Sequence, residues 1–352
     1  MVIEFQNYHF NHQGGHVMNQ SGESTKRMFN FSARDYAVEF AKTDYVHIPN
    51  GLTKEFYDLL SAQVDNHLEA NRLKEWAIGN KQQGLYHFPE GADYYAEFMQ
   101  AIGTVCGLDP KKLTLSERHI KAYEANANPN PLAHKDRYAS EISVGLSVTV
   151  PPGSRLVLYP KDDVSVNTYN TSARLRASFT EDNTPEKLLK NATKVIIEDS
   201  PGDIVIFRGN AVWHLRENPA STTNLYLKLN SFNCDPLGED PYTETVRQQT
   251  LSLLKASDET LKQSVPLLGR RVDYVHRQLS RQWDETTEVV FWGDRTLPVG
   301  DSEFEALKHL DWNNSVGGVI QKMNGKGEAH GIKAIRRLAS LGAIDLFQPV
   351  KN

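Results

Sequence analysis

A His-x-Asp triplet, His134-Lys135-Asp136, constrains more than any other feature how this 352-residue chain can fold. In a β-strand, side chains two residues apart point to the same face, so His134 and Asp136 can bind one ion together while Lys135 points away. In a helix the same two positions diverge. The triplet follows a turn-rich loop, EANANPNPLA, and precedes a strand-like run, EISVGLSVTV. This context predicts a pair of metal ligands on a strand.

The same pattern occurs twice more, at His67-Leu68-Glu69 and at His309-Leu310-Asp311. Both copies lie in segments whose apolar spacing predicts an amphipathic helix. We therefore expect these two copies to lie on solvated helix faces. Three early histidines could also suggest a metal site, but their polar surroundings favour an arm or a lid: His9, His12 and His16.

A third ligand is predicted in the segment PGDIVIFRGNAVWHLRE. It reads as a turn, a buried strand over 204–207, a second turn, and a strand over 211–215 that carries His214. Two imidazoles and one carboxylate can occupy one face of a metal ion and leave its remaining positions open. The alternative for His214 is a hydrogen-bonded core histidine beside Trp213.

The order of H-x-D, a stretch of strands, the GDIVIF run and a distal His resembles the Fe(II)/2-oxoglutarate-dependent dioxygenases, over roughly residues 40 to 235. The resemblance implies a mainly β fold with flanking helices, built on a double-stranded β-helix (a jelly-roll core of the cupin type). It implies Fe(II) held by His134, Asp136 and His214, with 2-oxoglutarate and O₂ as cosubstrates. The implied reactions are hydroxylation, desaturation or oxidative cyclisation at a C–H bond, with succinate and CO₂ as co-products.

Members of this family carry a basic residue after the distal His, and it pairs with the remote carboxylate of 2-oxoglutarate. Lys228, fourteen residues after His214, matches it here, where many members have Arg. Alternation places Tyr226, Lys228 and Asn230 on one strand face, and a lysine inside a barrel requires a charged partner. An outward-facing, solvated lysine is the alternative. Arg216 is the second candidate for binding the cosubstrate.

Cationic side chains near the predicted site favour a small polar substrate, such as an amino acid or a natural-product intermediate. In RHIKAYE, alternation places Lys121 and Tyr123 on one face, which is either the inner or the outer face of the barrel. Arg155, Arg208 and Arg216 are further candidates, because a guanidinium group binds a carboxylate through two hydrogen bonds.

Composition favours a small-molecule enzyme. The net charge is −5 and the pI is near 6.2, so no basic footprint suggests a nucleic acid. No apolar run is long enough to cross a membrane, and the N-terminal residues do not have the pattern of a signal peptide. The two cysteines, Cys106 and Cys234, have no metal-type spacing. We therefore expect a cytoplasmic protein without membrane or nucleic-acid partners.

The chain is predicted to have three parts. Residues 1–240 form the jelly-roll domain with its N-terminal helices, and a polar insertion between Tyr159 and Val195 is expected to cover part of the site. Residues 241–287 are predicted to be helical, with a break near Pro266. Residues 288–352 form a small α+β module whose helix–helix–helix–strand order resembles a winged helix. This module is expected to pack on the barrel or on a second subunit, as in a homodimer.

Two other functions fit the same pattern. A cupin metalloenzyme that does not use 2-oxoglutarate, with Zn, Mn or Fe as an isomerase or dioxygenase, would use a similar barrel, although such cupins usually have more histidines in the first motif. A non-catalytic barrel, in which the C-terminal module binds a partner, is the other alternative. An intact triad together with Lys228 favours the oxygenase.

Overall fold

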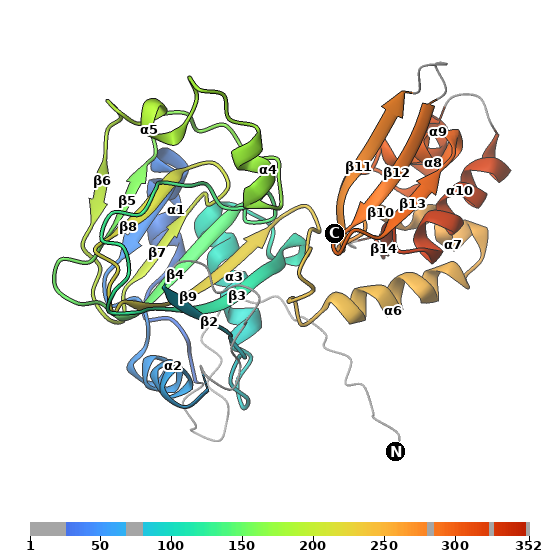
Figure 1. The fold of residues 1–352 in the computed structure, drawn as a ribbon. Helices are drawn as coiled ribbons and strands as arrows, with labels where there is room; N and C mark the ends of the chain where they lie inside the picture. The colour runs from blue at the N-terminus through green and yellow to red at the C-terminus, as the bar shows by residue number, and fades with distance from the viewer. Residues whose placement is uncertain (1–25, 68–79, 280–284, 324–326, 350–352) are drawn as a thin grey trace, which may run out of the picture.

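The structure is a computed structural model that describes residues 26–67, 80–279, 285–323 and 327–349. A strand-rich body lies beside a smaller C-terminal body, and a long helix, α6 (Thr243–Leu254), runs from one toward the other (Figure 1). The three early histidines and Glu69 lie outside the described residues. No helix in the described ranges is long and apolar enough to span a membrane.

The strand-rich body contains two sheets. The larger has the strand order β1 (Tyr45–Ile48), β7 (Ile204–Phe207), β4 (Ile142–Thr149), β9 (Thr223–Asn230), β3 (Thr114–Tyr123) and β2 (Lys81–Leu85). The smaller has the order β6 (Val195–Ile197), β5 (Arg155–Tyr159) and β8 (Trp213–Glu217), and an antiparallel bridge from His214 to His134 adds a fourth segment. From β3 to β9 the chain passes back and forth between the two sheets, the alternation that a double-stranded β-helix would require.

The two faces of the larger sheet have different roles. On β9, Leu225, Leu227 and Leu229 are fully buried in an apolar core outside the barrel. The helices that supply the other side of this core are α1 (Ala33–Thr43), α2 (Lys54–His67) and α3 (Tyr94–Cys106). Strand alternation then turns Tyr226 and Lys228 toward the barrel interior. Because the main core lies outside the barrel, the interior can hold polar groups.

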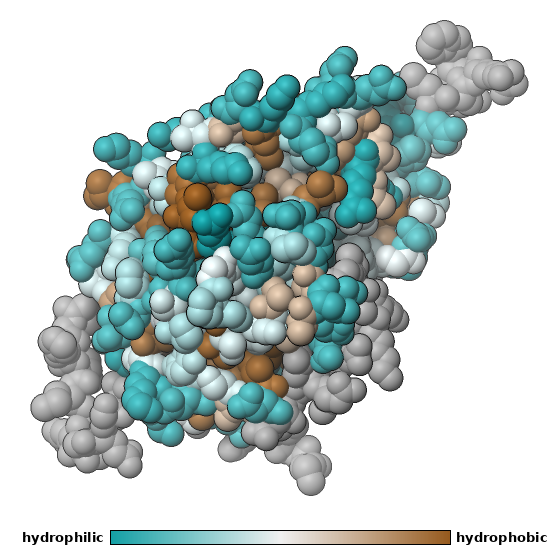
Figure 2. All heavy atoms as spheres, turned by 60° about the vertical axis from the view of Figure 1, so that its left-hand side comes forward, coloured by the Kyte–Doolittle hydropathy of each residue, from teal (hydrophilic) through white to brown (hydrophobic). Residues whose placement is uncertain are grey.

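Most large apolar side chains are inside the molecule. The face shown in Figure 2 is mainly hydrophilic, with smaller hydrophobic areas between polar side chains. Among the exceptions, Val38 is 79% exposed and Leu132 is 68% exposed. The insertion after β5 contains two short helices without buried residues, α4 (Ser172–Ala177) and α5 (Pro185–Leu188).

The C-terminal part has its own apolar core. After α6 its elements are α7 (Asp258–Gln263), β10 (Val265–Leu268), β11 (Val272–Leu279), β12 (Glu285–Phe291), β13 (Thr296–Val299), α8 (Asp301–Leu307), α9 (Val316–Lys322), α10 (Glu328–Ser340) and β14 (Ile344–Phe347). The predicted order of three helices and a strand is therefore present. Contacts with the strand-rich body include Arg270 to Asp240 at 3.1 Å and Trp312 Nε1 to the Ser231 carbonyl at 2.7 Å.

Two sequence predictions are corrected here. The segment 241–287 is helical only as far as Gln263, because 265–279 forms strands that pair with β14 and β12, far along the chain. Pro266 lies inside one of these strands. His309 follows the end of α8, and Asp311 accepts hydrogen bonds from the backbone of Asn313 and Asn314 in a turn. Distant strand pairing overrides local apolar spacing in the first case.

Candidate metal centre

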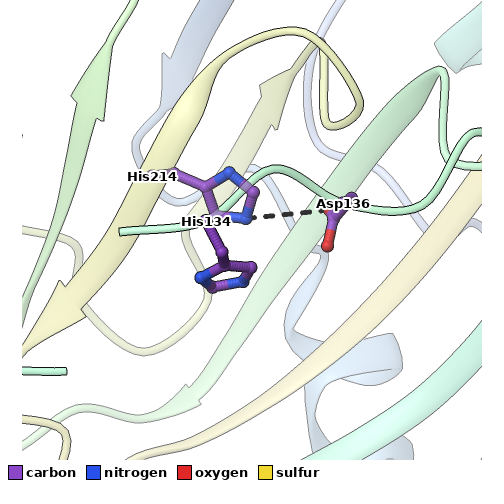
Figure 3. Close-up of side chains that lie close together, drawn as sticks. All are labelled: His134, Asp136 and His214. Carbon is purple, nitrogen blue, oxygen red and sulfur yellow. Dashed lines mark ion pairs between the residues drawn. The ribbon is translucent and has the colours of Figure 1, made fainter. Parts of the chain in front are cut away.

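His134, Asp136 and His214 come together where the two sheets meet. Each offers one ligand atom, and these atoms all lie within 4.8 Å of one another. Figure 3 shows the three side chains, with His214 Nε2 lying 3.7 Å from Asp136 Oδ2. His134 and His214 are joined by two backbone hydrogen bonds of 2.9 Å, so the bridge between the two segments fixes the spacing of the imidazoles. The structure thus assembles the predicted ligand set.

Neighbouring groups orient two of the ligands. Ser143 donates its hydroxyl to Asp136 Oδ2 at 2.6 Å. His214 Nδ1 lies 3.0 Å from the carbonyl oxygen of Val212, which favours the tautomer protonated at Nδ1 and leaves Nε2 free for a metal. Partners of this kind hold a metal ligand in its binding orientation before the metal arrives.

The charge states also suit a metal. Burial lowers the pKa of His134 well below its ordinary value and also lowers that of His214, so both imidazoles are neutral at neutral pH. Burial opposes ionisation of Asp136, but the positive charges beside it, Lys228 foremost, outweigh burial and hold the pKa of this carboxyl below its usual range. A neutral imidazole and an ionised carboxylate are the forms that bind metal. Asp136 and His214 are buried, whereas His134 packs its ring against that of His214, with 4.4 Å between the ring centroids, and leaves another part of the residue exposed.

Gly209 approaches the site closely. Its carbonyl accepts a hydrogen bond from the Asp136 backbone N–H at 2.9 Å. A Cβ at this position would lie 2.1 Å from Ser143 Oγ and 2.8 Å from Asp136 Oδ2. Only glycine therefore fits beside the carboxylate without displacing it.

We expect Gly209→Ala to weaken metal binding by about tenfold or more, because the methyl group forces Asp136 and Ser143 apart. Calorimetric titration with Co(II) measures the change. Gly318→Ala is the matched control, since a Cβ there meets only ordinary contacts at 3.7 Å. Unchanged affinity in Gly209→Ala would show that the carboxylate does not need its present position.

Lys135 points away from the metal ligands, as the alternation predicts. Its ammonium donates to the carbonyl oxygens of Asp163 and Ser165, both at 2.7 Å, and lies 4.9 Å from the centre of the Trp213 ring. Asp163 and Ser165 belong to the insertion between Tyr159 and Val195. The insertion therefore packs against the side of the His134–Asp136 segment that faces away from the candidate metal ligands. Asn167 completes the support by donating its side-chain amide to the Asp136 carbonyl at 2.7 Å.

Lys228 lies inside the barrel, so the outward-facing alternative is wrong. Its ammonium is 2.6 Å from Asp136 Oδ1 and 3.3 Å from Glu117 Oε1, and the residue is only 4% exposed. Glu117 stands directly opposite Lys228 on β3. The lysine therefore has two carboxylate partners, one of which is a candidate metal ligand.

Glu117 is the centre of a buried charge cluster. Its carboxylate is 3.0 Å from Lys121, 3.2 Å from Arg137 and 3.3 Å from Lys228. Burial opposes its ionisation, but Lys121 and Lys228 outweigh burial and hold the pKa of Glu117 well below the usual range. The sequence prediction missed this residue. Alternation extended one step back from His119 would have placed Glu117 on the same face.

The other predicted contacts divide into two groups. Lys121 faces the interior, where its ammonium lies 5.0 Å from the centre of the Tyr226 ring, and Tyr123 follows two residues later on the same face of β3. Arg155 and Arg208 are instead paired with Glu217 and Asp44, each at 2.7 Å. Arg155 alternates with inward-facing leucines on β5, and the Arg208 guanidinium lies over the ring of Phe40 on α1, so the structure does not bring these two arginines to the site.

Arg216 is buried with its charge already compensated. Its guanidinium binds both oxygens of Asp199, at 3.0 and 2.7 Å, in a bidentate pair. Burial disfavours the charged form, but Tyr226 and Asp199 outweigh it and raise the pKa of Arg216. Asp199 was not expected from the sequence, because it lies seventeen residues away in an irregular segment.

No protein-family model matches the chain, and no curated protein matches it. Several solved structures align with it. The non-haem α-ketoglutarate-dependent carbocyclase SnoK from nogalamycin biosynthesis is 14% identical, with a TM-score of 0.44 over 56% of this chain and 85% of that one. A prolyl-4-hydroxylase from Pseudomonas putida is 14% identical, with a TM-score of 0.38 over 56% and 96%. EctD from S. alaskensis with bound Fe is 14% identical, with a TM-score of 0.41 over 57% and 77%. At similarities this low, the function has to be inferred from the residues of the site.

Proposed function

We propose that the protein is an Fe(II)- and 2-oxoglutarate-dependent oxygenase. The observation that carries the proposal is the cluster of His134, Asp136 and His214, whose ligand atoms lie within 4.8 Å of one another in a double-stranded β-helix. Three protein ligands of this kind leave other coordination positions open. A ferrous ion with 2-oxoglutarate and O₂ supplies the oxidising power for attack on a C–H bond, and succinate and CO₂ are the co-products.

The protein groups bind and orient the reactants. Ser143 fixes the Asp136 carboxylate, and the Val212 carbonyl fixes the ring of His214. We propose hydroxylation, desaturation or oxidative cyclisation of a small polar substrate, because Asp136 supplies a full carboxylate ligand at the centre. The choice among these outcomes depends on where the substrate places its C–H bond.

Lys228 is the proposed contact for a carboxylate of 2-oxoglutarate. In the structure its ammonium pairs with Asp136 and Glu117. A divalent cation bound to Asp136 would take over that carboxylate and repel the ammonium, which then requires another anion. Arg216 is the weaker candidate, because Asp199 already neutralises it.

Anaerobic titration with Fe(II) followed by 2-oxoglutarate tests the proposal. A chelated keto acid gives a weak visible charge-transfer band, and we expect the wild-type protein to develop it. Metal binding without this band would favour a cupin metalloenzyme that does not use 2-oxoglutarate. Binding of neither component would favour a non-catalytic barrel.

We expect Lys228→Ala to weaken 2-oxoglutarate binding by about 1.5–3 kcal/mol, the typical contribution of a hydrogen bond to a charged group. Metal binding should not weaken, because the substitution removes a cation from beside Asp136. Lys228→Arg should retain part of the affinity. The KM for 2-oxoglutarate is the measurement, and an unchanged KM in Lys228→Ala would move the assignment to Arg216.

A further inference from the structure

Lys81 is a partly buried lysine that lacks an anionic partner among the described residues. It lies on β2, the edge strand of the larger sheet, directly opposite Tyr123 of β3. Its ammonium lies 5.5 Å from the centre of the Tyr123 ring, an aromatic contact that supplies no negative charge. An ammonium removed from water in this way is costly unless an anion binds it.

Lys81 lies on the same sheet face as Lys121 and Lys228, because it stands opposite Tyr123, which alternates with Lys121 along β3. The charge of Lys81 acts on His134, and Asp136 acts on it in turn. Burial, together with the neighbouring Lys121 and Lys228, lowers the pKa of Lys81 to about 8. Lys121 shows the contrast, since Glu117 beside it outweighs burial and raises its pKa. Of these two lysines on adjacent strands, Lys121 is paired with a carboxylate, whereas the part of the chain that the structure describes brings none to Lys81.

Among the described residues around the centre, cationic side chains outnumber carboxylates. Three lysines, Lys81, Lys121 and Lys228, face two carboxylates, Glu117 and Asp136. Arg137 adds a further positive charge at Glu117. Binding of Fe(II) and 2-oxoglutarate does not change the balance, because two positive charges and two negative charges enter together. The uncompensated charge therefore remains for a third molecule.

The position of Lys81 distinguishes that molecule from the cosubstrate. Lys121 and Lys228 lie on β3 and β9, which are strands of the double-stranded β-helix itself. Lys81 lies on β2, one strand beyond it at the sheet edge. A group held by Lys81 therefore approaches the metal from the edge of the barrel, whereas Lys228 lies beside Asp136 in the interior.

We propose that Lys81 binds a carboxylate of the molecule that is oxidised, so that the substrate of this enzyme is a carboxylic acid. The inference rests on the proposed oxygenase function and names the substrate class of that site. A single ammonium beside a neutral tyrosine ring matches one singly charged carboxylate. Lys81 is a positioning residue, which holds the substrate while the metal and cosubstrate carry out the oxidation.

Succinate formation by the Fe(II)-loaded protein with 2-oxoglutarate provides the test. The probes are the proteinogenic amino acids and a set of aliphatic and aromatic monocarboxylic acids. Each acid is compared with its primary amide, in which the carboxylate charge is removed. We expect some acids to stimulate succinate formation while their amides do not. For those acids, Lys81→Met should raise the half-saturating concentration by about tenfold or more, the loss expected for one charge-assisted contact. Lys81→Arg should restore part of it.

Two comparisons keep the result specific. The KM for 2-oxoglutarate should change less than about twofold in Lys81→Met, and Lys54→Met, which removes an exposed lysine paired with Asp58, should behave as wild type. Amides that stimulate as well as acids, a panel in which no acid stimulates, or a raised KM for 2-oxoglutarate would each overturn the assignment. The charge-transfer band distinguishes failure of the oxygenase proposal from failure of the substrate proposal. If the wild-type protein gives no band, the oxygenase proposal is wrong. If the band appears but acids stimulate no better than amides, only the assignment of a carboxylic acid substrate is wrong.

Discussion

Replacing His134, Asp136 or His214 with alanine is expected to reduce turnover to background and to weaken metal binding by at least about 100-fold. Each residue is one of the three proposed metal ligands, and loss even of a residue that supports a ligand typically lowers metal affinity 10–100-fold. The fold should persist, because the largest apolar core lies outside the barrel, between the larger sheet and the N-terminal helices. Anaerobic calorimetry with Fe(II) or Co(II), together with circular dichroism, measures both properties.

The chain supplies its own control for this experiment. His309-Leu310-Asp311 repeats the same H-x-D pattern, but Asp311 lies in a surface turn, where it accepts backbone hydrogen bonds. Asp311→Ala should therefore leave metal affinity and turnover unchanged. Retention of wild-type affinity in all three triad variants would show that the metal, if one binds, is held elsewhere.

The cluster of His134, Asp136 and His214 could be predicted because the spacing of these residues and their local context agree. An H-x-D pair can chelate on a strand but not readily on a helix, and only the copy at His134 lies in a strand-like context. Alternation along β9 likewise placed Lys228 on the face opposite Leu227, and burial of the leucines turned the lysine inward. Both predictions depend only on neighbours within a few residues.

The ion pairs could not be predicted in the same way. Which carboxylate meets Lys228 depends on the register between β3 and β9, and these strands lie about a hundred residues apart. Arg155 and Arg208 were predicted to bind a substrate carboxylate, but in the structure they form ion pairs with Glu217 and Asp44. Alternation shows which residues share a face, whereas it does not show which distant strand supplies their partners.

The proposed role of Lys81 could not be predicted from the sequence either, because it also depends on strand pairing. Its strand, KQQGL, is short and polar, and nothing in it indicates a place beside a metal centre. Only the pairing of β2 with β3 brings Lys81 opposite Tyr123 and within reach of the charges around Asp136. Lys81, which we propose selects the substrate, could therefore be identified from the strand pairing but not from a sequence motif.

Glu117→Gln is expected to destabilise the protein by about 3–5 kcal/mol, the usual cost of removing one partner from a buried ion pair. The amide has nearly the same shape, but it leaves Lys121, Arg137 and Lys228 together without the carboxylate that they share. Chemical denaturation followed by circular dichroism measures the change. Glu217→Gln is the control, since its partner Arg155 has a side chain that is 38% exposed, and exposed pairs contribute about 1 kcal/mol or less.

The pH dependence gives this prediction a second, independent measurement. The pKa of Glu117 is held well below its ordinary value in the folded protein by Lys121 and Lys228, against the effect of burial. A carboxyl whose pKa is depressed on folding contributes stability above its unfolded pKa of about 4.3, and this contribution is lost as the pH falls toward the folded pKa. The difference between wild type and Glu117→Gln should therefore stay constant between pH 6 and 8 and shrink below about pH 4. Adding Lys121→Met to Glu117→Gln should recover part of the lost stability, because it removes one of the three cations that Glu117 held together. Equal losses in Glu117→Gln and Glu217→Gln, or a difference that grows on acidification, would show that the buried carboxylate does not hold the cluster together.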